Sequence, residues 1–160
     1  MTTTTLLLTA LLALAPISEL RGAIPFAVLR GISLPAAVLI SIGFNALVPL
    51  VVFIFLSTLH KFLYRWNLYH SFFDRVVEKT RIKVHPKVEK YGYLGLLLFV
   101  AIPLPVTGAW TGALGAWILG MQKRKAVPAI IAGVCIAGII VGILVFVFGA
   151  GTRTIFFKQF

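Results

Sequence analysis

The chain has 160 residues, of which 60% are apolar and 12% are charged, with four acidic side chains and a formal net charge of +11. A soluble domain carries about twice that charged fraction, so this composition excludes an ordinary soluble protein. The basic residues lie beside apolar stretches without an RNA- or DNA-binding motif, which argues against nucleic acid as a partner and favours anionic lipid headgroups. We therefore expect an all-α integral membrane protein, with residues 1–160 forming a single membrane domain.

Two short apolar stretches open the chain, Leu6–Ala15 and Ala23–Leu29, and a polar break at Pro16–Gly22 separates them. Neither stretch reaches the roughly 20 residues that cross ~30 Å of hydrocarbon. The pattern predicts a re-entrant hairpin that enters and leaves through one face of the membrane. An exterior loop between two helices is one alternative. A cleaved signal peptide at Met1–Ala15 is another, although Thr2–Thr5 stand where a basic region is usual.

The polar break carries the most informative side chains. Glu19 and Arg21 are ionisable. Placing either side chain at bilayer depth costs at least about 2.5 kcal/mol on insertion scales, so their presence there indicates a functional role. The planar fork of Arg21 suits phosphate or carboxylate, while Glu19 can pair with it or bind a proton that couples transport. A close pair requires irregular backbone, because these positions do not face each other on a helix. We expect a substrate site here, with Glu19 also in proton coupling: Ser18, Glu19, Arg21 and Gly22.

The uncharged stretch Ile32–Leu59 predicts the first full transmembrane helix. The basic segment that follows, residues 60–90, has apolar side chains at spacings of three and four, which predicts an amphipathic helix on the inner leaflet that ends at Pro86. A partner-binding helix is the alternative interpretation. The apolar positions of this pattern are Phe62, Trp66, Tyr69, Phe73 and Val76.

Charge placement predicts the topology. Eight Lys and Arg residues lie in residues 60–90 and three more in residues 123–125, so the positive-inside rule places both segments in the cytoplasm and both termini outside. The uncharged stretch Tyr91–Gln122 then begins and ends on the same side, and its 32 residues do not fit two crossings. We expect a second re-entrant hairpin there.

The tip of this second hairpin is predicted at Pro103–Gly108, where two prolines and a glycine interrupt the helix. The returning arm points its N-terminus toward the membrane midplane, and its unpaired N–H groups attract an anion. A threonine hydroxyl can serve as a ligand, and a tryptophan follows. The expected substrate-binding residues of this tip are Pro103, Pro105, Thr107, Gly108 and Trp110.

The second span is predicted at Ala126–Thr152, and residues 153–160 form a tail. Residues 1–59 and 91–152 then have the same layout in opposite orientations, as in many secondary transporters. A shift of 93 positions also aligns several residues of the two spans. The aligned pairs are Pro35 with Pro128, Ala36 with Ala129, Val48 with Val141, Val52 with Val145, Phe53 with Phe146 and Phe55 with Phe148.

Small residues recur every fourth position at Gly108, Gly112, Ala116 and Gly120. Such a stripe lets another helix approach closely. It indicates packing within the chain or contact with a second copy, and we expect a homodimer.

Residues 19–25, Glu-Leu-Arg-Gly-Ala-Ile-Pro, and residues 103–112, Pro-Leu-Pro-Val-Thr-Gly-Ala-Trp-Thr-Gly, resemble the two signature stretches of the putative small multi-drug export protein family. Its halves are distantly similar to the DedA, or SNARE-associated (VTT), superfamily. That resemblance implies opposed re-entrant hairpins, lipid transport or scrambling, and a link to polyprenyl phosphate carriers. By position it supports Glu19, Arg21, Pro103, Pro105 and Gly108 as site residues. Unlike DedA proteins, the chain has no arginine in its second hairpin.

The leading hypothesis is a transporter of a polyprenyl phosphate or related anionic lipid, coupled to protons, in the cytoplasmic membrane of a prokaryote. A small cationic multidrug exporter with Glu19 as counter-ion is the first alternative, and a membrane scaffold is the second. Arg21 argues for an anion over a cation. No nucleotide-binding, hydrolase or metal-ligating motif is present in the sequence, so we expect no enzyme activity, cofactor or metal.

Overall fold

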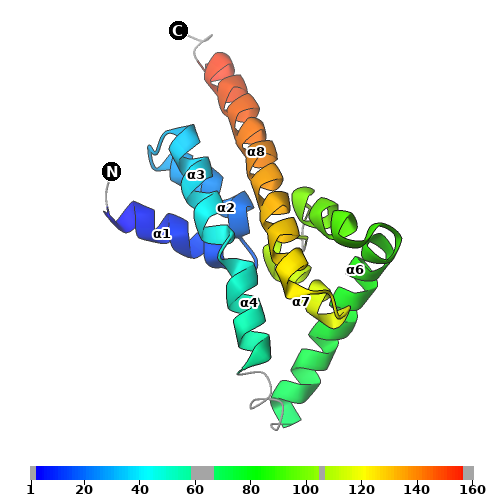
Figure 1. Ribbon diagram of the computed structural model, residues 1–160. Helices are drawn as coiled ribbons and strands as arrows, with labels where there is room; N and C mark the ends of the chain where they lie inside the picture. Colours follow the sequence, from blue (N-terminus) through cyan, green and yellow to red (C-terminus); the bar gives the residue numbers. More distant parts are fainter. Residues whose placement is uncertain (1–2, 59–66, 105–106, 157–160) are drawn as a thin grey trace. The chain divides into compact units, whose positions relative to one another are not determined.

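A computed structural model of the chain describes residues 3–58, 67–104 and 107–156. These residues are helical and contain no strand (Figure 1), as expected of an all-α protein. The helices are α1 (Thr3–Leu14), α2 (Glu19–Leu29), α3 (Leu34–Asn45), α4 (Val48–Ser57), α6 (Asn67–Ala101), α7 (Ala109–Ile118) and α8 (Lys123–Phe156).

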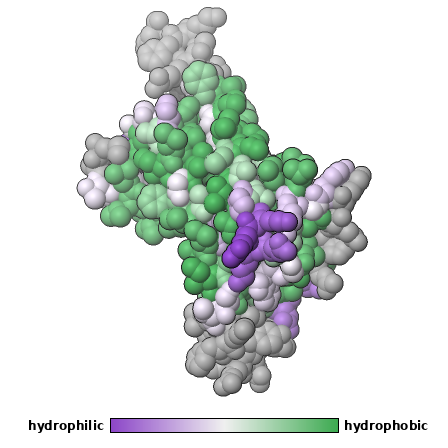
Figure 2. Space-filling model, in the orientation of Figure 1, coloured by the Kyte–Doolittle hydropathy of each residue, from purple (hydrophilic) through white to green (hydrophobic). Residues whose placement is uncertain are grey.

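Among the residues that the structure describes, two segments are long and apolar enough to cross a membrane, Leu34–Ser57 with 24 residues and Lys123–Gly149 with 27. They correspond to the two spans predicted from the sequence. Much of the surface in Figure 2 is hydrophobic, and the most hydrophilic residues gather in one area of that face. Exposed aliphatic and aromatic side chains on this scale suit a hydrocarbon solvent better than water.

The first span is interrupted, which the sequence analysis did not anticipate. Helix α3 ends at Asn45 and α4 begins at Val48, with a turn at the two residues between them. Pro49 is the second residue of α4, where its missing N–H group is tolerated because the first turn has no partner for it. The break therefore lies directly before a proline in the middle of the span.

The chain forms two compact units, Met1–Asn45 with Ile136–Phe160 and Ala46–Cys135. In the first unit, α1, α2 and α3 pack against one another. The carboxyl half of α8 lies against α3 through two glycines four residues apart: a Cβ on Gly138 would lie 2.6 Å from Ile42, and one on Gly142 would lie 2.9 Å from Val38. This small-residue pair permits the close helix contact.

In the second unit, α7 packs against α6 and α4. The amino-terminal half of α8 approaches α6 closely, because a Cβ on Gly133 would lie 2.7 Å from the carbonyl oxygen of Leu97 and 2.8 Å from Cβ of Val100. Phe73 is buried and makes an edge contact with Trp117, with ring centroids 6.1 Å apart.

Helix α6 contains two helices joined at Gly92, whose φ of 56° and ψ of −128° are not helical. The prediction that the helix ends at Pro86 is wrong: the backbone stays helical to residue 91. A proline removes one hydrogen bond, and neighbouring turns can carry the helix past it, whereas Gly92 adopts a left-handed φ that only glycine tolerates well. Phe62 and Trp66 of the predicted amphipathic pattern lie outside the described residues.

Two short helices end in the same way, one in each unit. After α2, Gly31 (φ 83°) donates its N–H to the carbonyl of Val28 at 3.0 Å, and Ile32 donates to Ala27 at 3.0 Å. After α7, the N–H of Gly120 (φ 65°) lies 3.1 Å from the carbonyl of Trp117, and that of Met121 lies 2.9 Å from the carbonyl of Ala116. Both are Schellman caps, in which a left-handed glycine terminates the helix.

Candidate functional site

The first predicted tip is shorter than the sequence suggested. Helix α1 ends at Leu14 and α2 already begins at Glu19, so the irregular segment comprises residues 15–18. The predicted break Pro16–Gly22 is therefore wrong at its carboxyl end: Glu19, Arg21 and Gly22 lie in the first turn of α2. Acidic residues favour this position, because the first helical turn presents unpaired N–H groups and the positive end of the dipole.

Glu19 combines burial with unusual backbone. It has a φ of 47° and is 8% exposed, and it is the one acidic residue in the sequence of the first unit. Left-handed φ in a residue other than glycine or asparagine is uncommon and clusters at functional sites. Arg21 is half-buried and interacts electrostatically with Glu19. The irregular backbone that such a pair requires is thus present at Glu19 itself.

Ser18 and Gly22 fit together next to this pair. A Cβ on Gly22 would lie 2.2 Å from Oγ of Ser18, so the glycine leaves room for the serine side chain. Within the described residues the Ser18 Oγ is buried without a hydrogen-bond partner, and it does not cap α2. The hydroxyl is therefore a candidate ligand, in keeping with the predicted substrate site.

Two further polar residues near this tip were missed by the sequence analysis. Asn45 and Ser41 are fully buried on α3, four residues apart and therefore on one face of the helix. Nδ2 of Asn45 donates to the carbonyl of Ala13 at 2.8 Å, in the last turn of α1 directly before the irregular segment.

Ser41 and Asn45 each keep one oxygen unused. Oγ of Ser41 and Oδ1 of Asn45 have no hydrogen-bond partner among the described residues. Buried polar groups are normally hydrogen-bonded, and exceptions need a cause. An asparagine inside an otherwise apolar span was the signal that could have revealed them.

At the second tip, the hydroxyl of Thr107 is engaged in the loop. Its Oγ1 lies 2.8 Å from the carbonyls of Ile102 and Leu104 and accepts from the N–H of Leu104 at 3.2 Å. The threonine thus closes the turn between α6 and α7. Helix α6 ends at Ala101 and α7 begins at Ala109, so the predicted interruption at Pro103–Gly108 is confirmed.

The remaining predicted residues of the second tip have different environments. Pro103 and Trp110 are half-buried, and Gly108 is buried with extended backbone (φ 165°) at the start of α7. Pro105 lies outside the described residues.

Most of the predicted small-residue stripe is used inside the second unit. A Cβ on Gly112 would lie 2.6 Å from Cγ2 of Val100 on α6, and Ala116 is fully buried. Gly120 is exposed beyond the end of α7, where it forms the Schellman cap instead of a helix contact. Packing within the chain therefore accounts for Gly112 and Ala116.

Comparison with known proteins identifies the family. The model of the family described as putative small multi-drug export protein matches residues 19–140, about three quarters of the chain. The chain belongs to this family. No match was found among the curated proteins or among the solved structures.

The match begins at Glu19, the first residue of α2, and includes the second tip and about half of α8. Membership in the small multi-drug export family, together with two helices apolar enough to span a membrane, supports a membrane protein with a role in transport. It favours a transporter over an enzyme.

Proposed function

We propose that this family member translocates a polyprenyl phosphate or related anionic lipid across the cytoplasmic membrane and that proton binding at Glu19 drives the cycle. The observation that carries the proposal is the pair formed by buried Glu19 and half-buried Arg21 at the start of α2. A guanidinium is suited to a phosphate, which it can bind through two parallel hydrogen bonds.

The Glu19–Arg21 pair suggests how the binding of a proton promotes the binding of an anion. While Glu19 is ionised it occupies Arg21, and a lipid phosphate must compete with it. When Glu19 binds a proton, Arg21 loses its internal partner and becomes available to the headgroup. The unused oxygens of Ser18, Ser41 and Asn45 add polar groups to the interior of the same unit. Proton binding and phosphate binding are thereby coupled through one arginine.

Helix lengths support re-entrant hairpins. Helices α1 and α2 have 12 and 11 residues, and α7 has 10. At 1.5 Å per residue they are about 15–18 Å long, roughly half of the hydrocarbon thickness. The apolar arm Tyr91–Ala101 is also too short to span. Two pairs of half-length helices beside two spanning segments are the parts that the proposed architecture requires.

The proposed inverted repeat is supported by matching details. The Schellman glycines Gly31 and Gly120 are 89 positions apart, and each precedes a spanning segment. Within the amino-terminal parts of the spans, burial recurs at the offset of 93: Ala37 and Ile130 are fully buried, Ser41 and Val134 are at most 1% exposed, and Val48 and Val141 are both buried. We propose that residues 60–90 and 123–125 face the cytoplasm.

Export of small cationic drugs is the second candidate, and the family description favours it. Glu19 would then pair with the cationic substrate. Arg21 would weaken this binding, because a fixed cation next to the carboxylate repels a positively charged substrate.

Proteoliposomes that contain labelled polyprenyl phosphate, assayed beside uptake of a cationic dye, distinguish the two candidates. Arg21→Lys keeps the charge but loses the planar fork, and a charge-assisted hydrogen bond is worth about 1.5–3 kcal/mol, so lipid translocation should fall about 10- to 100-fold. Glu19→Gln cannot titrate, so any remaining translocation should lose its pH dependence.

Arg124→Lys is the matched control, since Arg124 is an exposed arginine outside the first unit, and it should leave translocation unchanged. If dye moves, lipid phosphate does not, and Arg21→Ala leaves dye transport intact, the anionic-lipid proposal is wrong and drug export replaces it.

A further inference from the structure

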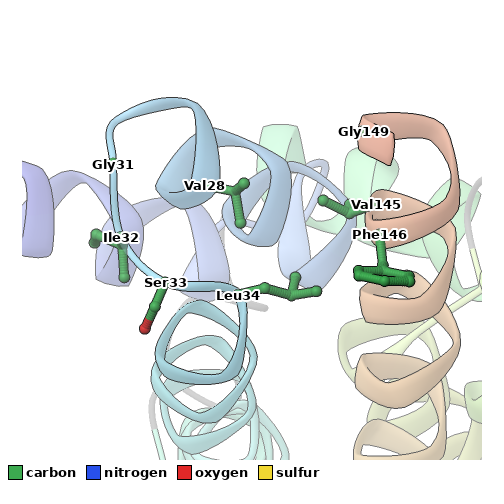
Figure 3. Close-up of a pocket in the computed structure, with 8 residues that line it drawn as sticks. All are labelled: Val28, Gly31, Ile32, Ser33, Leu34, Val145, Phe146 and Gly149. Carbon is green, nitrogen blue, oxygen red and sulfur yellow. The ribbon is translucent and has the colours of Figure 1, made fainter. Parts of the chain in front are cut away.

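A cavity of about 460 Å³ lies in the first unit, apart from Glu19 and Arg21. It is formed by the segment that joins α2 to α3 and by the carboxyl half of α8, and its size is within the range of about 300–1,000 Å³ that is typical of small-molecule sites. In Figure 3, Val28 and Val145 point toward each other across the cavity, as do Leu34 and Phe146, while the Ser33 hydroxyl points away. The lining of the cavity is therefore mostly apolar.

The cavity lies at the end of both candidate spans. Leu34 is the first residue of one span and Gly149 is the last residue of the other, and both line the cavity. The neighbouring surface of α8 is strongly apolar, with Phe146 65% and Phe148 71% exposed. A cavity at this level borders both the acyl chains and the headgroups of a surrounding bilayer.

The positively charged side chain of Arg30 lies beside the cavity. Arg30 is exposed and precedes the lining residue Gly31, and its guanidinium carbon lies 5.3 Å from the centroid of the Phe26 ring. In the sequence of the first unit Glu19 is the one acidic residue, so the charge at this edge suits an anion. An apolar chamber with an arginine at its rim matches a molecule with a hydrocarbon chain and a negatively charged head.

We infer that this cavity binds a membrane phospholipid with an anionic headgroup, whose acyl chain enters between Leu34 and Phe146 and whose phosphate contacts Arg30. The site is separate from the proposed transport site and does not depend on what is transported. It holds a bilayer lipid against the segment that joins α2 to the first span. With the predicted orientation, this is a lipid of the outer leaflet.

The test uses the full chain in nanodiscs that contain phosphatidylglycerol with a photoreactive group on its acyl chain, and adducts are mapped by mass spectrometry. We expect adducts to concentrate at residues 28–34 and 143–149. Gly149→Phe places a phenyl ring at a lining residue of the cavity, and a Cβ there meets no atom within 4 Å. Gly43→Phe is the matched control, because Gly43 is an exposed helical glycine of the same unit with equally open surroundings.

Adducts should fall at least about tenfold in Gly149→Phe, because the buried chain loses its apolar contacts, and should stay unchanged in Gly43→Phe. Arg30→Gln should remove the preference for phosphatidylglycerol over phosphatidylcholine. Adducts spread evenly along α3 and α8, or unaffected by Gly149→Phe, would overturn the inference. So would equal labelling by both lipids in the unaltered chain, or a dimer that Gly149→Phe dissociates, since a second copy would then cover the cavity.

Discussion

The two units are built from similar parts but differ in the polarity of their interiors. Each contains a pair of short helices, a glycine-capped helix end and halves of the spanning segments. Among the described residues, the buried polar side chains of the first unit are Thr5, Thr9, Glu19, Ser41 and Asn45, whereas the second unit has Thr80. At the offset of 93, Ser41 corresponds to Val134 of the second unit, which is apolar.

This difference suggests that the two units have different functions. Buried polar groups in a membrane protein are costly and mark functional positions by default. The second unit instead packs apolar side chains and glycines tightly, and its one tip hydroxyl, Thr107, is engaged within its own loop. In our proposal the first unit binds the substrate and the proton, and the second provides a rigid frame with the same architecture.

The largest expected effect concerns the glycines that hold α8 in each unit. Gly133 faces a backbone carbonyl and a Cβ, which cannot move aside, whereas Gly138 faces Cδ1 and Cγ1 of the Ile42 side chain, which can change rotamer. Overpacking costs about 1–3 kcal/mol, so Gly133→Ala should lower the free energy of unfolding by the upper end of that range and Gly138→Ala by less. Thermal unfolding in detergent measures both.

Gly43→Ala is the matched control for these variants, because a Cβ there meets no atom within 4 Å. It should be neutral or slightly stabilising, since alanine is the better helix former. Equal losses for Gly133→Ala and Gly138→Ala would contradict the view that the second unit is the more rigid.

A smaller effect is expected from exchanging polarity between the equivalent positions 41 and 134. Ser41→Ala removes a buried hydroxyl that has no partner in the described part of the chain, so stability should be kept or rise by about 1 kcal/mol, while lipid translocation should fall. Val134→Thr buries a new hydroxyl at nearly constant shape and should cost about 1 kcal/mol without a specific loss of transport. Unfolding and translocation are measured on the same preparations. A stability loss in Ser41→Ala with normal transport would show that the serine is structural.

Sequence patterns predicted the parts that composition and backbone chemistry determine locally. Long uncharged stretches located both spans within a few residues, and the prolines and glycine of residues 103–108 located the second interruption. The predictions were wrong at two places, in both cases because of the local backbone. The helix continues past Pro86 and breaks at Gly92, and α2 already begins at Glu19, within the predicted polar break.

Packing partners could not be predicted, because hydrophobicity alone does not say which faces meet. The sequence analysis did not consider Asn45, whose amide donates to the carbonyl of Ala13 at the end of α1, 32 residues away. The stripe at Gly112 and Ala116 was open to two interpretations until the contact with Val100 assigned it to the second unit. The predicted homodimer and the orientation in the membrane remain predictions.

The most direct test of the account is the side of the membrane on which equivalent loops lie. Ser33 and Gln122 follow the two Schellman glycines at equal distances, and both are exposed. With Cys135 replaced by alanine, single cysteines are introduced as Ser33→Cys and Gln122→Cys and treated with an impermeant thiol reagent. An inverted repeat with the predicted orientation requires that position 33 is labelled in intact cells and that position 122 is labelled only after permeabilisation. Labelling of both positions from the same side would contradict the inverted repeat and the transport mechanism proposed from it.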